Sequence, residues 1–292
     1  MDTQISSDKN TIFSPNLTIN CRGKLINFNK ALVMGILNIT EDSFYDGGKH
    51  LTEENWLAQT QKMLTEGADI IDIGAASTRP GAKPQSAEVE AKLLKTVIRS
   101  IRKEQPEILL SVDTYHASVA EMAVDNGADI INDISGGEMD KEMFTIMGKL
   151  KVPYILMHIK GSPENMQINP VYENLIEEIM LYFAEKIMQL SMLGVNDVIL
   201  DPGFGFGKTL TQNYELLQKL DLFKFHELPI MAGFSRKSMI NKVLETSPAE
   251  ALNGTTVLNT IALLKGANIL RVHDVKEAVE AVKLCGMMKK EL

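Results

Sequence analysis

The chain has 292 residues, with 30 Lys and Arg against 38 Asp and Glu, which gives a formal net charge of −8. Hydrophobic residues make up 45% of the chain, enough to form a buried core, so extended disorder is excluded. The acidic excess has no basic block beside it, which argues against nucleic acid or an anionic membrane as a partner. A chain of this length forms either one large α/β domain or two ordinary ones.

The cysteine content and the N-terminus indicate a compartment. Cys21 and Cys285 are far apart and lack metal-ligand spacing, so neither a disulfide framework nor a structural zinc site is expected. Residues 1–10 are polar and no apolar run is long enough to span a bilayer, so no signal peptide or membrane span is predicted. We therefore expect a cytoplasmic protein.

At the N-terminus we expect two elements before the main fold. Residues 1–17 are predicted to be a flexible tail, and residues 18–292 are predicted to form one domain, because no Pro/Gly/Ser-rich linker divides them. The segment Thr18–Phe28 has the length and pattern of a hairpin, which could close the bottom of a barrel.

A short repeated phrase is the most informative pattern in the chain. It reads Gly67-Ala-Asp-Ile-Ile-Asp72, Gly127-Ala-Asp-Ile-Ile-Asn132 and Gly266-Ala-Asn-Ile-Leu-Arg271, with a looser copy at Gly194–Asp201. Each copy follows a stretch with helical periodicity, and its Gly suits the left-handed position that ends a helix. The apolar run that follows suits a strand buried on both faces of a parallel sheet. The phrase therefore predicts a helix-to-strand junction.

Four further apolar runs complete the predicted sheet: Ala31–Leu37, Leu109–Val112, Tyr154–Met157 and Ile230–Ala232. Together with the four repeats they make eight strands, separated by segments long enough for crossover helices. Eight alternating strand and helix units in one domain predict a (β/α)8 TIM barrel. A doubly wound open sheet has the same local pattern and stays an alternative on periodicity alone.

Polar groups follow the predicted strands. In a (β/α)8 barrel the strands' C-terminal ends meet at one face, where active sites form. Asp133 and the pair Asp113-Thr114 could instead serve as caps or turns. The strand-end groups are Asn38, Asp72, Asp113, Asn132, Asp133, His158, Asp201, Ser235 to Lys237, Arg271 and His273.

Three segments after these strands have the composition of functional loops. One is the polar loop Asn38–Gly48 with its Gly pair, and another is Ala76–Gly81, which carries Arg79. The third, Gly233–Ser238, precedes a helix predicted to begin near Met239, where outward-pointing N–H groups can receive a carboxylate or phosphate. A plain N-cap is the other interpretation of Ser238.

The glycine-rich segment Asp201–Thr209 invites a nucleotide-binding interpretation, which it fails. Pro202 stands where a Walker motif needs its first Gly, and the register of a dinucleotide fold is absent. The glycines can instead let a flat ligand approach the backbone, with Phe206 beside it. His158 can equally be a core histidine or a site residue. His273 lies two residues after Arg271, so both can face one side and hold a pyrophosphate.

The ordered set of strand-end motifs closely resembles that of the dihydropteroate synthase family, within the pterin-binding barrel superfamily. The resemblance covers residues 32–282. It rests on Met34–Gly48, Asp72–Gly81, Ser111–Thr114, Ile131–Gly137, Leu156–His158, Asp201–Lys208, Ser235–Ser238 and Arg271–Asp274. It implies an enzyme that joins dihydropterin-methyl pyrophosphate to p-aminobenzoate, using Mg²⁺, and that forms a homodimer through outer helices, to which the apolar stretch Ala278–Met288 could contribute.

The resemblance also implies roles for individual residues. The catalytic set would be Asn38, Asp46, Arg79, Lys237, Arg271 and His273. The pterin pyrophosphate would be bound by Thr78, Asp113, Asn132, Asp201, Lys237, Arg271 and His273. The p-aminobenzoate would be bound by Phe44, Pro80, Phe206 and Ser238, and Mg²⁺ by Asn38.

The departures from the family pattern are small. Ala75-Ala76 stand where Gly-Glu is usual, and Glu41 replaces a usual Pro, which loosens that loop's backbone. Two other functions stay open: a methyltransferase acting on methyltetrahydrofolate on a related barrel, and a pterin-binding protein without catalysis. The first has no use for Ser235–Ser238, and the second has no use for Asn38 or His273.

Overall fold

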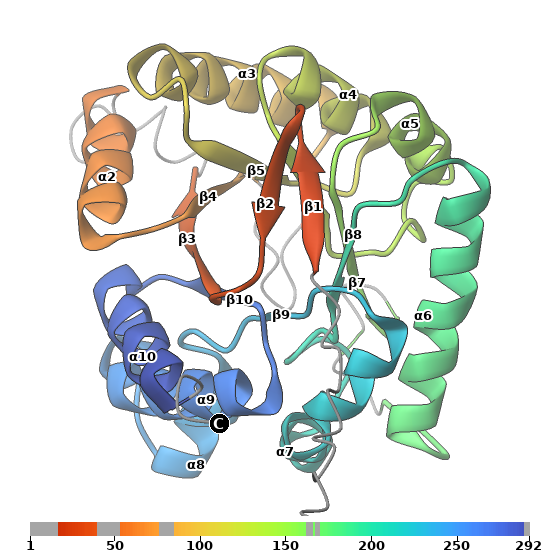
Figure 1. The fold of residues 1–292 in the computed structure, drawn as a ribbon, viewed down its shortest axis with the longest axis vertical. Coiled ribbons are helices and arrows are strands. Elements are labelled where there is room, and N and C mark those ends of the chain that lie inside the picture. Colours follow the sequence, from red (N-terminus) through yellow and green to blue (C-terminus); the bar gives the residue numbers. More distant parts are fainter. Residues whose placement is uncertain (1–16, 40–52, 76–84, 162–165, 167–169, 289–292) are drawn as a thin grey trace, which may run out of the picture.

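The computed structural model describes residues 17–39, 53–75, 85–161, 166 and 170–288. In these residues a parallel sheet curls into a ring with helices outside it (Figure 1). Its strands are β3 (Leu32–Asn38), β4 (Ile70–Gly74), β5 (Leu109–Asp113), β6 (Ile130–Asp133), β7 (Tyr154–Met157), β8 (Val198–Asp201), β9 (Met231–Ala232) and β10 (Ile269–Val272). They are ordered β8-β7-β6-β5-β4-β3-β10-β9, and a parallel bridge between Leu200 and Ile230 joins the two ends. The predicted barrel is confirmed and the open sheet is wrong.

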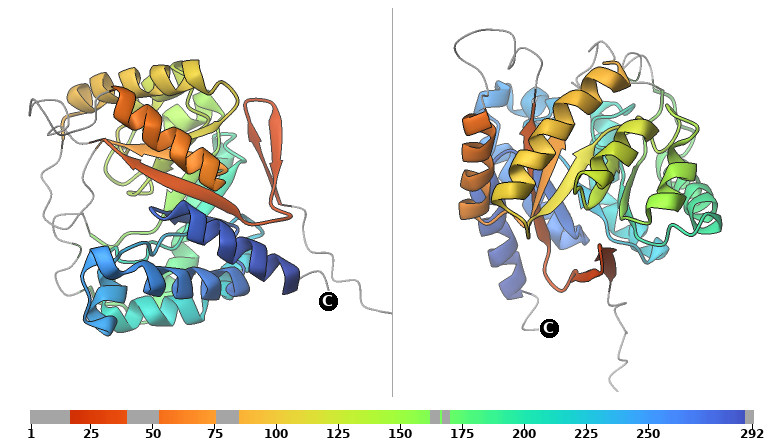
Figure 2. Two further views of the ribbon diagram at one scale, coloured as in Figure 1. Left: turned by 90° about the vertical axis from the view of Figure 1, so that its left-hand side faces the viewer. Right: turned by 90° about the horizontal axis from the view of Figure 1, so that it is seen from above.

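Helices alternate with the strands and cover the outside of the ring (Figure 2). They are α2 (Glu53–Glu66), α3 (Ala87–Glu104), α4 (Ala117–Asp125), α5 (Met143–Leu150), α6 (Leu175–Met192), α7 (Leu210–Gln218), α8 (Ser238–Leu244), α9 (Leu252–Lys265) and α10 (Val275–Met288), with short 3-10 turns η1 (Leu220–His226) and η2 (Pro248–Glu250). Local chemistry sets their ends: α7 begins at a capping box of Thr209 and Gln212. No helix in the described ranges has the length and apolar character needed to cross a membrane.

The repeated phrase forms the predicted helix-to-strand junction, and its first polar residue has a further role. Gly67, Gly127 and Gly266 have φ of +101°, +110° and +104°, the left-handed conformation that ends a helix. The Asp or Asn two residues later bonds to the neighbouring strand twice. Asp129 donates its N–H to the Leu110 carbonyl and accepts the Leu110 N–H on Oδ2, both at 2.8 Å.

The same pair of bonds recurs in the two other close copies of the phrase. Asp69 makes it to Val33, and Asn268 makes it to Ile230. Each of these three copies therefore aligns the start of its own strand with the strand beside it.

The predicted hairpin closes the N-terminal end of the barrel. β1 (Thr18–Cys21) pairs antiparallel with β2 (Lys24–Asn27), and Figure 2 shows the hairpin standing at one end of the strand ring. Its buried Ile19 and Cys21 pack on the first inward-facing residues of the strands, among them Ile70 and Ile130. This apolar floor seals one end. Residues 1–16 of the predicted tail lie outside the described residues.

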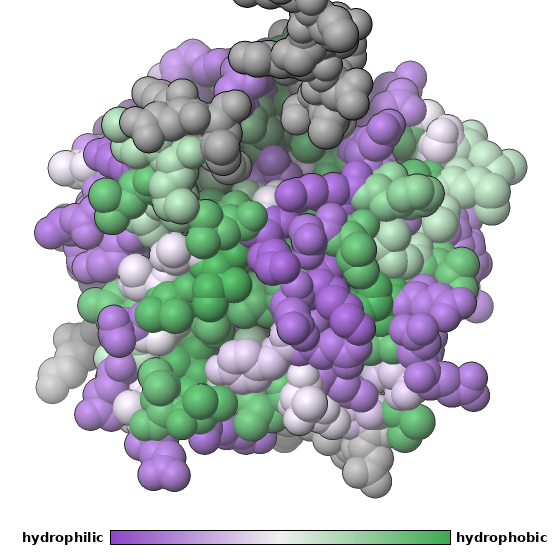
Figure 3. Space-filling view, turned by 60° about the horizontal axis from the view of Figure 1, so that its bottom comes forward, coloured by the Kyte–Doolittle hydropathy of each residue, from purple (hydrophilic) through white to green (hydrophobic). Residues whose placement is uncertain are grey.

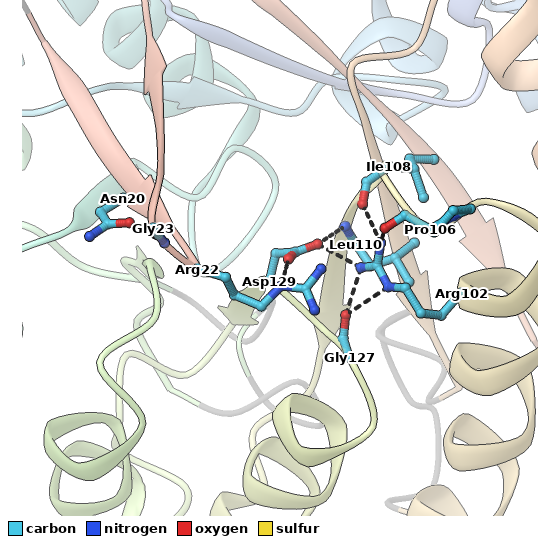
Figure 4. A network of polar contacts seen from close by, with 9 residues as sticks. All are labelled: Asn20, Arg22, Gly23, Arg102, Pro106, Ile108, Leu110, Gly127 and Asp129. Carbon is cyan, nitrogen blue, oxygen red and sulfur yellow. Dashed lines mark hydrogen bonds and ion pairs between the residues drawn. The ribbon is translucent and has the colours of Figure 1, made fainter.

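A network of polar contacts holds the hairpin against the N-terminal end of the barrel (Figure 4). Asp129 is 1% exposed and lies between two guanidinium groups: Arg22 of the hairpin pairs with one carboxylate oxygen, and Arg102 of α3 pairs with the other at 2.7 Å. Arg102 also donates to the carbonyls of Pro106, Ile108 and Gly127. The carboxylate is thus fully paired, as burial of a charge requires.

Candidate active site

Inward-facing side chains change character along the barrel axis. Successive residues of a strand point to opposite faces, so each strand contributes every second residue to the interior. At the hairpin end these are apolar residues such as Ile70, Ile155 and Ile199. Two residues further along, the inward positions hold polar groups, including Asp72, Ser111, Asn132, Asp201 and Arg271. A polar layer therefore lies above an apolar floor, at the C-terminal ends of the strands.

A pocket opens in this layer. It brings together the predicted pterin-site residues that the structure describes, apart from His273, and adds apolar walls. Its lining is Asp113, Asn132, Ile134, Met157, Asp201, Phe206, Gly233, Lys237 and Arg271. Ile134, Met157 and Phe206 belong to one small apolar cluster at the barrel mouth. A pocket with convergent polar groups and apolar sides suits a flat ligand with hydrogen-bonding edges.

Asp72 does not line the pocket but holds the side chains that do. This fully buried carboxylate accepts hydrogen bonds from Ser111 Oγ at 2.6 Å, Asn132 Nδ2 at 3.1 Å and Arg271 Nε at 2.7 Å. Arg271 Nη2 also donates to Asp113 Oδ2 at 2.8 Å. Burial lowers the pKa of Arg271, but Asp72 and Asp113 outweigh it and raise that pKa above its ordinary value. The guanidinium is therefore always charged and held in one orientation.

The two pocket carboxylates keep free acceptor capacity. Asp113 uses Oδ2 for Arg271, and Asp201 uses Oδ1 to accept the Gly203 N–H at 2.8 Å. Burial raises the pKa of Asp113 to about 7, against the lowering effect of Arg271, and burial also raises the pKa of Asp201. Asn132 donates an N–H of its side-chain amide to Asp72, so the amide oxygen of Asn132 remains available to a ligand.

Lys237 supplies the pocket's second cation. It is the N-cap residue of α8, and its ammonium donates to the Phe204 carbonyl and lies 4.7 Å from the centre of the Phe206 ring. Burial lowers its pKa to about 8, with Asp201 acting in the opposite direction. The helix begins at Ser238, one residue earlier than predicted, so Ser238 is its first residue and not its cap.

Lys208 is a residue whose role the sequence did not predict. Its ammonium is 2% exposed and donates to the carbonyls of Gly203 at 2.9 Å and Phe206 at 3.0 Å, and it lies 3.0 Å from His158 Nδ1. Burial lowers its pKa to about 7, and burial with Lys208 nearby lowers the pKa of His158. Lys208 therefore holds the glycine-rich loop from inside, and His158 is a core histidine.

The glycines of this loop permit close backbone packing. At Gly203, with φ of +71°, an added Cβ would lie 1.9 Å from the His158 carbonyl oxygen. Only glycine fits there without moving the backbone that holds Asp201 in place.

Three predicted residues lie at the rim or in the wall of the barrel. His273, just after β10, is exposed at one edge, and its Nδ1 lies 2.9 Å from Ser235 Oγ. Asn38 is exposed at the end of β3 and lines a separate hollow with α2 residues. Asp133 does not face the pocket: it accepts from the N–H groups of Ser135 and Gly137 and from Tyr154, so the alternative that it organises a turn is correct.

The other predicted site residues are not described by the structure: Phe44, Asp46, Thr78, Arg79 and Pro80 lie outside the described residues. Among the described residues, Asp72 and Ser235 are predicted strand-end groups to which the sequence assigns no individual role, and Lys208 is not predicted; all three support the site. The sequence contains a pattern that could predict a role for Asp72 at the site. Asp72 occupies the same position in its copy of the repeat as Asn132 and Arg271 do in theirs.

The fold and the pocket are those of a (β/α)8-barrel protein with a site suited to a flat, hydrogen-bonding ligand at the C-terminal ends of its strands. Residues 34–273 match the model of a family described as "Pterin binding enzyme". The dihydropteroate synthase of Escherichia coli K12 is 40% identical over 265 residues, covering 90% of this chain and 93% of its own.

Solved structures agree with the family match. A Yersinia pestis dihydropteroate synthase in complex with a sulfonamide drug has a TM-score of 0.88 at 39% identity, covering 94% of this chain and 100% of its own. The Xanthomonas albilineans enzyme with 4-aminobenzoic acid has a TM-score of 0.86 at 34% identity, covering 94% and 98%. The chain belongs to the pterin-binding enzyme family and groups with its dihydropteroate synthases, transferases of folate synthesis, which confirms the resemblance inferred from the sequence.

Proposed function

We propose that this protein condenses (7,8-dihydropterin-6-yl)methyl diphosphate with p-aminobenzoate, giving 7,8-dihydropteroate and pyrophosphate. The observation that carries the proposal is the pocket in which Asp113, Asn132, Asp201, Lys237 and Arg271 converge beside Phe206. A methyltransferase or a carrier would share this pocket, but neither needs the basic groups Lys237, Arg271 and His273 at one barrel mouth.

The polar groups match the edges of a pterin. Its amide N–H and amino group are adjacent donors, which one carboxylate can accept in a bidentate manner. Asp201 takes this role, because its Oδ2 is free and its Oδ1, which accepts the Gly203 N–H, can accept a second hydrogen bond. Asp113 and Asn132 bind the remaining groups on the same edge of the pterin. Lys237 donates to the ring acceptors, and Arg271 stacks on the ring, as guanidinium planes do.

The reaction requires no protein nucleophile. The bond between the methylene carbon and the diphosphate oxygen breaks, and its electron pair leaves with the pyrophosphate. The cationic methylene, stabilised by the electron-rich dihydropterin, then takes the p-aminobenzoate nitrogen, which loses one proton. Groups preorganised around the leaving pyrophosphate, Arg271 and His273 among those described, supply most of the catalysis.

Magnesium is the expected metal, and the chemistry of the available donor fits it. Mg²⁺ prefers oxygen ligands and is commonly held by few protein groups together with phosphates and water. Asn38 presents one exposed amide oxygen, and the described residues contain no cluster of three acidic, His or Cys side chains that could hold a metal alone. We therefore propose that Asn38 holds Mg²⁺ together with the pyrophosphate, where the ion would neutralise the charge of the leaving group.

The p-aminobenzoate lies next to the pterin in this proposal. Phe206 lines the pterin pocket and is positioned to contact both rings, and the exposed Ser238 at the start of α8 would receive the carboxylate. Phe44 and Pro80 complete the predicted site, and Asp46, Thr78 and Arg79 complete the predicted loops.

One assay tests the function. We expect Mg²⁺-dependent release of pyrophosphate that depends on p-aminobenzoate at steady state and equals the dihydropteroate formed. Binding of the pterin without turnover would support the carrier instead, and methyl transfer from methyltetrahydrofolate would support the methyltransferase. A rapid-mix experiment in which no pyrophosphate forms before arylamine attack would overturn the dissociative step.

We also propose a homodimer built on outer helices, centred on α9. This helix has one charged residue in 14, and Val257, Ile261 and Leu264 form an exposed stripe 37–53% accessible. Leu244 of α8 and Leu284 of α10 extend it, and Figure 3 shows apolar surface gathered on this side. A helix that is apolar on both faces is typical of burial on both, so a second copy is the expected cover.

Size-exclusion chromatography with light scattering checks this assembly. We expect a dimer for the wild type and a monomer for Leu264→Glu, because a charge in a dry interface is strongly disfavoured. The matched control is Leu181→Glu on α6, where Leu181 is 63% exposed and outside this face, and it should stay dimeric. A monomeric wild type would contradict the proposal.

We also propose a cytoplasmic location, on the basis of a cysteine side chain. Cys21 is a buried free thiol, a state typical of a reducing compartment.

A further inference from the structure

Two consecutive residues after β9 pair with two consecutive residues after β10. Ser235 Oγ lies 2.9 Å from His273 Nδ1 and accepts the His273 backbone N–H at 3.1 Å. Next to it, Arg236 donates from Nε at 3.2 Å and from Nη2 at 2.6 Å to the two carboxylate oxygens of Asp274. This double pairing holds the two loops in one register.

The second pair, Arg236 with Asp274, fixes the position of the loop after β9 relative to the loop after β10. Arg236 has φ of +59°, a left-handed conformation that costs energy in a residue other than glycine. The bidentate ion pair with Asp274 and the bond from the Arg236 N–H to Thr255 Oγ1 at 3.3 Å compensate for it. Ser235 is therefore presented to the imidazole by a loop that has little freedom to move.

The available donors and acceptors decide whether Ser235 Oγ or His273 Nδ1 carries the proton of the hydrogen bond between them. Ser235 is 6% exposed, and its hydroxyl has one proton, for which Nδ1 is the acceptor within reach in the described part of the chain. If Nδ1 carried a proton, Oγ would accept twice from His273 and its own buried proton would have no partner there, which is unfavourable. The satisfied arrangement is Oγ–H donating to an unprotonated Nδ1.

The surroundings keep the ring neutral. The charged groups that face it are Arg271, Arg236 and Lys237 on the cationic side and Asp274 on the anionic side. His273 is exposed at one edge, but the partial desolvation of its ring, followed by Arg271 and Arg236, lowers its pKa to about 4. At neutral pH one proton remains, and with Nδ1 occupied it resides on Nε2.

We propose that Ser235 is a positioning residue that fixes His273 in the tautomer with its proton on Nε2, so that the ring presents a neutral hydrogen-bond donor to the leaving pyrophosphate. The use of this donor rests on the function proposed above, whereas the tautomer is a property of the ligand-free protein. In the other tautomer Nε2 would turn a lone pair toward the anion and repel it.

The test combines ¹⁵N–¹H correlation spectra of the histidine rings, recorded on ligand-free protein near pH 7.5, with steady-state kinetics. His273→Gln assigns the signals by the loss of one ring. We expect a protonated Nε2 and an unprotonated Nδ1 in the wild type. We expect mixed tautomers in Ser235→Ala, with kcat reduced about three- to tenfold and the KM of the pterin diphosphate changed by less than about twofold.

Two further variants separate positioning from simple loop support. Ser235→Thr retains the hydroxyl and should restore the single tautomer and kcat. Thr255→Val removes a hydroxyl that supports the same loop through the Arg236 N–H, and it should leave the tautomer unchanged. Thermal melting of each variant shows whether it is folded.

The proposal is overturned by a wild-type His273 protonated on Nδ1, by an unchanged tautomer in Ser235→Ala, or by an unchanged kcat in that variant despite mixed tautomers. Failure of the proposed function would look different, because the wild type itself would then release no pyrophosphate while its ring spectra kept the expected pattern.

Discussion

Replacing Asp72 by alanine is expected to lower the free energy of unfolding by about 3–5 kcal/mol, the cost typical of removing one partner from a buried ion pair. The carboxylate is fully buried and accepts from Ser111, Asn132 and Arg271, so its loss leaves three donors without their acceptor. Arg271 would retain Asp113 alone. Urea denaturation followed by circular dichroism measures the change.

The matched control is a surface ion pair. Asp221 pairs with Lys265 at 3.4 Å, and both side chains are at least one-third exposed. Asp221→Ala should cost less than about 1 kcal/mol, because water screens such pairs. An Asp72→Ala loss as small as that of the control would show that Asp72 does not hold the pocket together.

Replacing Asp201 by asparagine is expected to weaken pterin binding about 100-fold, since hydrogen bonds to a charged acceptor contribute about 1.5–3 kcal/mol each. Asparagine places an N–H₂ group among ligand donors and removes the negative charge near Lys237. Calorimetric titration with the pterin diphosphate, and its KM, measure the effect. The KM of p-aminobenzoate should stay within about threefold, because the proposed position of that substrate does not contact the carboxylate.

Asp133→Asn is the matched control for that variant. Asp133 is also a buried aspartate at a strand end, but it binds the Ser135–Gly137 turn and Tyr154. Its replacement should reduce stability and leave pterin affinity unchanged. Equal pterin affinity in Asp201→Asn and the wild type would refute the proposed role of Asp201 in reading the pterin edge.

The sequence by itself determined the alternation of the barrel, because that alternation rests on local physics. The glycines of the repeat adopt the left-handed conformation that ends a helix, and the apolar run after each one cannot remain exposed to water. Motifs read in order then identified the family. The predicted pterin residues Asp113, Asn132 and Asp201 do line one pocket.

Only the tertiary structure decided which strand-end groups face that pocket. The strands are buried on both faces, so their hydrophobic pattern does not reveal which residues point inward. Adjacent residues therefore separate: Asn132 points into the barrel, and Asp133 points away from it. Asp72 accepts a hydrogen bond from Arg271, 199 positions away in the sequence, and Lys208 donates to the Gly203 carbonyl within its own loop. Such contacts form only when the ring of strands closes, because closure and not local preference brings distant side chains together.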